Sequence, residues 1–296
     1  DSHILHLADR IAVLVDKDYE VLEQVPLIVK KIRERTDDIF MPQLVHAFVG
    51  LASRESFWLD ALAPSSRLLT FDKASEAAIG LTSEDMMGLS RLFSRVIDFK
   101  SPFTVTHSSG VATSAEILAR LFSFTERDCR LMRIAGHLHD LGKLAVPVEI
   151  LDKPSGLMDR EFNIVKHHAY NTYRLLETIP SFDTLNKWAS YHHERIDGAG
   201  YPFHLKKEDF IFGSQIMAVA DVFTAITEDR SYRAGMPMQR AVRVLGNMAD
   251  ASALSKEIVA KLKENYDEID AARVCAQTSA ASDYKDMMLQ CSDYLS

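Results

Sequence analysis

Five histidines and two aspartates in the central part of the chain have the residue types of a metal centre. They are His107, His139, Asp140, His168, His192, His193 and Asp221. Each cluster falls on a different predicted helix, and helical bundles build metal sites from the inward side chains of facing helices. A single histidine on a half-buried helix is more often a hydrogen-bonded core residue. The prediction of a metal centre therefore depends on the occurrence of all seven residues together. We expect these side chains to meet around metal ions, with His167 as a neighbouring alternative to His168.

The two pairs of adjacent candidates predict room for more than one ion. Adjacent residues on a helix point about 100° apart, because one turn takes ~3.6 residues. His139 and Asp140 can therefore address two neighbouring ions, and an aspartate has two oxygens with which to bridge them. We expect His192 and His193 at the end of a helix, where local unwinding turns both rings inward.

The candidate ligand atoms are nitrogen and oxygen only, with at least two carboxylates. This donor set favours iron or manganese over a thiolate-rich zinc site, while zinc and nickel remain open. Two ions close together suit phosphodiester cleavage, because they lower the pKa of a water between them, polarise the phosphorus and hold the leaving oxygen.

Helical periodicity dominates the chain, and no set of alternating strands is visible. An N-terminal stretch from Leu7 to about Leu62 predicts several amphipathic helices, with a break at Met41-Pro42. Thr82 and Thr125 are good helix N-caps. The helices expected to position the candidate ligands cover residues 106–122, 125–142, 158–178, 182–194 and 213–228, with two or three more from residue 238 onward. The sequence therefore predicts an all-α fold.

Composition limits the classes of partner. The 296 residues are 47% hydrophobic and 26% charged, as in globular proteins with a real core. A net charge of −8 argues against polymeric nucleic acid as a partner, so a phosphate-bearing ligand needs a local cluster of positive groups. Three cysteines without a CxxC pair, and no apolar run of ~20 residues, favour a cytoplasmic protein or the cytoplasmic part of a larger one.

Five segments resemble the HD-GYP family in order and spacing. These are His139–Pro147, Ile150–Pro154, His192–Pro202, Val219–Phe223 and Asp229–Arg233, and the match spans roughly residues 95–245. The resemblance implies an all-helical HD-superfamily bundle that binds two or three metal ions. It also implies degradation of cyclic di-GMP to the linear dinucleotide pGpG or on to GMP, with the mixed guanine–adenine cyclic dinucleotide preferred by some members.

The same resemblance assigns the candidate ligands to individual ions. It implies one ion on His107, His139, Asp140 and Asp221, and a second on Asp140, His168, His192 and His193, with Asp140 bridging. Phe103 stands where three-metal members carry a glutamate, so we expect two divalent ions here, iron or else manganese.

The substrate-binding and catalytic roles are also implied by resemblance. Lys143 matches the lysine that contacts the scissile phosphate. Lys143 and Asp140 are therefore the two expected catalytic residues. Arg230 and Arg233 match positions that bind the other phosphate or the guanine bases. Tyr201 of the Gly-Tyr-Pro loop either contacts the substrate or braces the loop. Glu194 and Asp197 are candidates to accept hydrogen bonds from metal-bound histidines or to anchor that loop.

The sequence thus predicts a helical N-terminal domain over residues 1–90, with a regulatory, linking or dimerising role, and an HD-GYP phosphodiesterase domain over residues 91–296. Departures from the family pattern at Thr224, His204 and Gln215 leave the ligand set whole. They keep open a catalytically weak domain that senses a cyclic dinucleotide. Another HD-type phosphohydrolase would need no Gly-Tyr-Pro loop, so this loop argues against that alternative.

Overall fold

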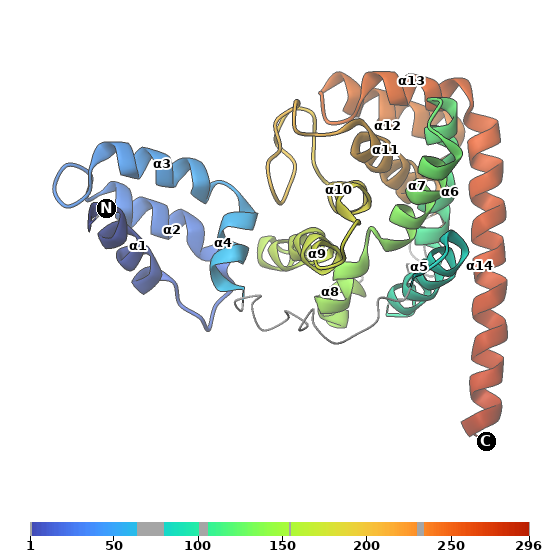
Figure 1. Ribbon diagram of the computed structural model, residues 1–296, viewed down its shortest axis with the longest axis horizontal. Coiled ribbons are helices and arrows are strands. Elements are labelled where there is room, and N and C mark those ends of the chain that lie inside the picture. Colours follow the sequence, from blue (N-terminus) through green and yellow to red (C-terminus); the bar gives the residue numbers. More distant parts are fainter. Residues whose placement is uncertain (1, 64–79, 101–105, 154, 230–233, 296) are drawn as a thin grey trace. The chain divides into compact units, whose positions relative to one another are not determined.

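The computed structural model describes residues 2–63, 80–100, 106–153, 155–229 and 234–295 (Figure 1). Within these ranges the regular structure is helical, and the one β-type pairing is an isolated bridge between Thr36 and Phe40. The prediction of an all-α fold is confirmed. In the part of the chain described, no helix is both long enough and apolar enough to cross a bilayer.

The first of two compact units groups Asp1–Ile79 with Leu157–His167. Its helices are α1 (Ser2–Leu14), α2 (Val21–Arg33), α3 (Pro42–Ala52), α4 (Glu55–Leu62) and the first part of α9 (Asp159–Glu177). Helix α3 begins at the expected proline, whose missing amide hydrogen costs nothing in the first turn. Phe48 and Trp58 pack edge to face with ring centroids 6.1 Å apart, and both are buried.

His167 belongs to this first unit. Its Nε2 lies 3.1 Å from Oε1 of Glu20, and the Glu20 carboxylate also accepts hydrogen bonds from the Leu22 and Glu23 amides at the start of α2. One residue earlier, Lys166 pairs with Glu55 at 2.9 Å. The ring of His167 therefore has a structural partner of its own.

The second unit groups Gly80–Gly156 with His168–Ser296. Its helices, besides the rest of α9, are α5 (Ser83–Asp98), α6 (His107–Leu121), α7 (Glu126–Leu138), the 3₁₀ helix η2 (Leu141–Ala145), α8 (Val148–Leu151), α10 (Asp183–Ser190), α11 (Phe212–Thr227), α12 (Met238–Asp250), α13 (Lys256–Glu264) and α14 (Tyr266–Leu295). The Thr82 and Thr125 side chains accept hydrogen bonds from the Asp85 and Asp128 amides, as their N-cap positions predict.

Helix α6 lies at the centre of this unit. It packs against α7, α11 and α14, and Figure 1 shows α14 running along it. The approach of α7 is so close that a Cβ on Gly136 would lie 2.4 Å from the Cα of Ala112. Leu118, Met132 and Phe223 are fully buried between these helices. The close packing holds the ends of α6 and α7 in fixed positions.

Two of the predicted helices end earlier than expected. Helix α7 ends at Leu138, so His139 is its C-cap and Asp140 lies beyond it. Helix α10 ends at Ser190, so His192 and His193 follow it. The periodic apolar pattern continues past both ends because these residues are buried, and it therefore overestimates helix length. The 100° separation assumed for a helical His139-Asp140 pair does not apply.

Gly136 supports a test of the close packing between α6 and α7. We expect Gly136→Ala to destabilise the second unit by about 1–3 kcal/mol, because its methyl group meets backbone rather than a flexible side chain. Gly88→Ala in α5 is the matched control, since an added Cβ there meets nothing within 4 Å and should stabilise the helix by roughly 0.5–1 kcal/mol. Urea unfolding measures both changes. Equal unfolding midpoints for the two variants would contradict the close approach of α7 to α6 at Gly136.

Candidate metal centre

The seven candidate ligands come together in the second unit. His107 is the first residue of α6, and His168 and Asp221 lie inside α9 and α11. The two adjacent pairs follow the C-terminal ends of α7 and α10. All but His193 and Asp221 are at most 4% exposed, and Asp221 is 8% exposed. Five separate segments thus bring their imidazoles and carboxylates into one buried cluster.

Three overlapping groups of residues have ligand atoms within 4.8 Å of one another. The groups are His107, His139 and Asp221; His139, Asp140 and His192; and His168, His192 and His193. In the first group, Oδ1 of Asp221 is 3.1 Å from Nε2 of His107 and 3.9 Å from Nε2 of His139. In the last group, the Nε2 atoms of His168 and His192 face each other at 3.2 Å.

Asp140 lies between the outer groups. Its Oδ2 is 3.2 Å from Nε2 of His139, and its Oδ1 is 3.5 Å from Nε2 of His168. Each carboxylate oxygen therefore faces a different set of histidines. This is the arrangement that a carboxylate bridging two neighbouring cations requires.

The hydrogen bonds of the imidazoles fit metal binding. Nδ1 of His139 donates to the carbonyl of Gly136 and Nδ1 of His192 donates to the carbonyl of Ala189, each at 2.7 Å. These bonds fix tautomers in which Nε2 presents a lone pair to the cluster. Nε2 of His139 is buried and makes no hydrogen bond within the described residues, although Oδ2 of Asp140 lies 3.2 Å from it. A cation bound by both atoms would give this nitrogen a partner.

Apart from His107, the electrostatics of the cluster point the same way. Burial favours protonated carboxylates, but His139 near Asp140 and His107 near Asp221 hold the pKa of both carboxyls below its ordinary value. Burial lowers the pKa of His193 to about 4 and that of His192 well below its ordinary value. Ionised carboxylates and neutral imidazoles are the states that divalent cations bind.

The structure adds Glu228, which the sequence interpretation missed. Its carboxylate oxygens lie 3.1 and 3.2 Å from Nδ1 of His107, opposite the Nε2 that faces Asp221. Gln277 of α14 donates to Oε2 of Glu228 at 3.1 Å. Glu228 follows Asp221 by seven residues, which is two turns of α11. Residues at this spacing lie on the same face of a helix, so the spacing could have indicated from the sequence that Glu228 is near Asp221. Although burial opposes protonation, Glu228 and Asp221 raise the pKa of His107 to about 10.

Thr172 of α9 holds the turn that carries Asp140 and was also missed. Its hydroxyl donates to the carbonyl of His139 at 3.1 Å and accepts from the amide of Gly142 at 2.9 Å. A Cβ on Gly142 would lie 2.0 Å from the carbonyl oxygen of His168, so the turn tolerates only glycine there. Lys143, the next residue, places Nζ 2.6 Å from Oδ2 of Asp140.

The Gly-Tyr-Pro loop lies against His193. The rings of Tyr201 and His193 stack with centroids 4.8 Å apart and an interplanar angle of 28°. The Glu194 carboxylate accepts hydrogen bonds from the amides of Phe203 and Leu205, at 2.7 and 3.0 Å. These two hydrogen bonds fit the predicted role of Glu194 as a loop anchor. Asp197 likewise accepts from the Ala199 amide within the loop.

Three positions from the sequence interpretation fall outside the described residues. Arg230 and Arg233, expected to bind substrate, and Phe103, expected to mark a two-ion centre, lie in the segments 230–233 and 101–105.

The contact between Glu228 and His107 predicts proton release on metal uptake. At about pH 7.5, below the His107 pKa of about 10, the metal-free imidazole is protonated and must lose a proton to bind a cation through Nε2. Glu228→Gln should bring the His107 pKa toward its ordinary value, reduce this release and weaken Mn²⁺ binding roughly 10–100-fold. Calorimetric Mn²⁺ titrations in two buffers of different ionisation enthalpy measure both quantities.

The matched control for this experiment is Glu257→Gln, which changes an exposed glutamate of α13 in the same unit. It should keep the proton release and the Mn²⁺ affinity of the unchanged chain. Equal proton release from the Glu228→Gln variant and the unchanged chain would contradict the proposed control of His107 by Glu228.

The candidate ligands lie in a part of the chain that matches a known protein family. Residues 91–258 match the family model of the HD domain, and this range includes all seven candidate ligands. Over 262 residues the chain is 32% identical to 3'3'-cGAMP-specific phosphodiesterase 3 of Vibrio cholerae, a match that covers 87% of this chain and 56% of that protein. Over 142 residues it is 41% identical to a cyclic di-GMP phosphodiesterase of Pseudomonas aeruginosa, covering 48% of this chain and 34% of the relative.

A solved structure of a cyclic GMP-AMP specific phosphodiesterase of V. cholerae is also similar to this chain. It has 27% identity and a TM-score of 0.45, over 94% of this chain and 60% of that one. The chain thus spans about half the length of the curated relatives that it matches over most of its own sequence. The matched range and its motifs identify this chain as a member of the HD domain family, of the HD-GYP type.

Proposed function

We propose that this chain is a metal-dependent phosphodiesterase that hydrolyses a cyclic dinucleotide. The observation that carries the proposal is the position of Asp140, with one carboxylate oxygen near His139 and the other near His168. A carboxylate shared by two groups of imidazoles fits a pair of divalent ions, and paired ions suit in-line displacement at phosphorus. The names of the relatives, all cyclic-dinucleotide phosphodiesterases, support the same substrate class.

The two ions divide the ligands between them in this proposal. One would be held by His107, His139, Asp140 and Asp221, and the other by Asp140, His168, His192 and His193. When bound, the ions supply an activated water and stabilise charge on the phosphoryl and leaving oxygens. The absence of thiolate from the ligand set favours iron, with manganese next.

The protein's own contribution begins with Lys143. Its ammonium group is 2.6 Å from Asp140, and its side chain is 20% exposed, so it borders both the buried cluster and solvent. We assign it to bind the scissile phosphate, where a compact positive charge stabilises the developing negative charge on oxygen. Arg230 and Arg233 are proposed to bind the second phosphate or the bases.

Tyr201 is proposed to act mainly on His193. Stacking of the two rings fixes the orientation of an imidazole that has to present one nitrogen to a cation. The loop holding Tyr201 is in turn fixed by Glu194, which is 1% exposed. This chain of contacts supports a bracing role for the Gly-Tyr-Pro loop.

Two substrates remain in the proposal because the relatives differ. Cyclic di-GMP is the first, with pGpG or GMP as product, and it is the substrate named for the relative with 41% identity. The mixed guanine–adenine cyclic dinucleotide is the second, because it is named for the relative that covers 87% of this chain. The helices before residue 90 are proposed to regulate or link the catalytic part, and to support homodimerisation.

His168 and its neighbour His167 provide a matched test of the metal centre. We expect His168→Asn to lose bound metal and at least about 100-fold in hydrolysis of either cyclic dinucleotide, because a ligand is removed. His167→Asn should keep both within about threefold, because His167 pairs with Glu20 in the first unit. Metal analysis and chromatography of products from anaerobically purified protein give the two readouts.

Lys143→Ala separates catalysis from metal binding. Because Lys143 is proposed to act on the phosphate, we expect kcat to fall by roughly 10²–10³ while metal content is retained. Hydrolysis unchanged in the Lys143→Ala variant would remove this residue from the mechanism. Nucleotide binding without hydrolysis, in unaltered protein that holds both ions, would favour a sensor over an enzyme.

A further inference from the structure

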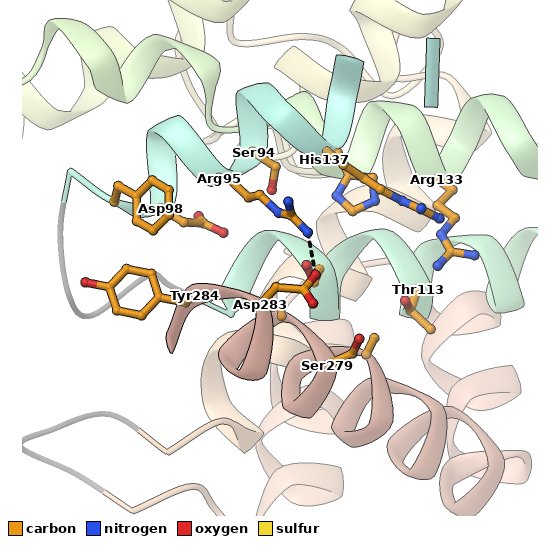
Figure 2. A pocket seen from close by; sticks show the side chains of 14 residues that line it. Ser94, Arg95, Asp98, Thr113, Arg133, His137, Ser279, Asp283 and Tyr284 are labelled. Atoms are coloured by element: carbon orange, nitrogen blue, oxygen red, sulfur yellow. Dashed lines mark hydrogen bonds and ion pairs between the residues drawn. The ribbon is translucent and has the colours of Figure 1, made fainter. Parts of the chain in front are cut away.

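A pocket of about 150 Å³ lies between α5, α6, α7 and α14, and none of the seven candidate metal ligands lines it. Figure 2 shows the side chains of Arg95, His137 and Arg133 on one side of this pocket, and Asp283 and Ser279 on the other. Its volume is comparable to that of an engineered cavity that takes up a small ring molecule. The space therefore suits a small ligand and not a whole dinucleotide.

Hydrogen-bond donors dominate the lining. Three arginines, Arg91 and Arg95 of α5 and Arg133 of α7, line the pocket together with the hydroxyl groups of Thr113 and Ser279. Arg91 makes no ion pair with the described residues. Donors that converge from four helices fit an acceptor-rich ligand, and arginine is the side chain best suited to oxyanions.

Two of these donor groups are buried without partners. Both ring nitrogens of His137 lack a hydrogen bond within the described residues, and the residue is only 4% exposed. Nε of Arg133 is also buried without a partner, although Nη1 of the same side chain is 3.2 Å from Glu116. A buried polar group without a partner is costly, so a ligand or ordered water that reached these atoms would stabilise them.

The two carboxylates of the lining have partners of their own. Asp283 of α14 pairs with Arg95, as the dashed line in Figure 2 marks. Asp98 accepts a hydrogen bond from the Ser108 hydroxyl at 2.9 Å, and burial raises its pKa to about 7, against the effect of that bond. Asp283 shows that a negatively charged oxygen is accepted at Arg95, and it would compete there with an incoming anion.

We propose that this pocket binds a small tetrahedral oxyanion, either inorganic phosphate or the phosphate group of a short phosphomonoester. Arg91, Arg95 and Arg133 supply the positive charge, and His137 and Thr113 supply neutral donors. Several donor directions match a tetrahedral anion better than a planar carboxylate. This site is separate from the proposed reaction at the metal centre and does not depend on that reaction.

Phosphate binding to the full metal-loaded chain tests the proposal, with calorimetry as the measurement. His137→Phe and Arg91→Gln should each weaken binding of inorganic phosphate about tenfold, because each removes a donor or a charge. Asp283→Asn should strengthen it several-fold by removing the competing carboxylate. Arg130→Gln, an exposed arginine of α7 outside the pocket, should leave the affinity unchanged.

Two further measurements keep the result unambiguous. The His137→Phe variant should keep the thermal midpoint of the unchanged chain in phosphate-free buffer, because the substitution removes a buried polar group that has no partner. If this variant does not fold, the Arg91→Gln variant tests phosphate binding in its place, because Arg91 is exposed. Glycerol 3-phosphate is the second probe: binding equal to that of phosphate indicates a phosphomonoester ligand, and weaker binding indicates the free anion. Equal phosphate affinity in all variants, or loss of binding only in His168→Asn, would overturn the proposal.

Discussion

The account depends on one carboxylate, that of Asp140, which is buried between two groups of histidines. A buried negative charge is costly without compensation, and here it has His139, His168 and the ammonium of Lys143 around it. Compensation by imidazoles alone leaves ring nitrogens crowded together, as the Nε2 atoms of His168 and His192 are at 3.2 Å. Divalent cations would resolve both problems, because they would neutralise the carboxylate and bind the ring nitrogens.

The fold supports this carboxylate by means of helix ends. His107 begins α6, and the two adjacent pairs follow α7 and α10, where the backbone no longer repeats the helical geometry. Thr172 and Gly142 fix one of these turns, and Glu228, held by Gln277 of α14, orients His107. Helix α14 thus contributes to the metal centre through Gln277 and to the second pocket through Asp283.

The candidate cluster could be predicted from the sequence because its members are rare residue types placed next to apolar helix positions. The all-α fold and the two threonine caps followed from periodicity and local chemistry. The ends of α7 and α10 could not be predicted from periodicity. An apolar periodic pattern indicates which residues are buried, and burial continues past Leu138 and Ser190, where the helices end. Glu228 and Thr172 were missed because their roles depend on contacts with residues 121 and 33 positions away. His137 showed no pattern of its own, and its lack of a partner is visible only in three dimensions.

Anomalous X-ray diffraction from crystals of the manganese-loaded chain tests the central claim most directly. The account predicts two peaks roughly 3.5–4 Å apart, as in two-metal sites, with one oxygen of Asp140 bound to each ion. A single peak that Asp140 does not contact, or two peaks on different parts of the chain, would contradict it.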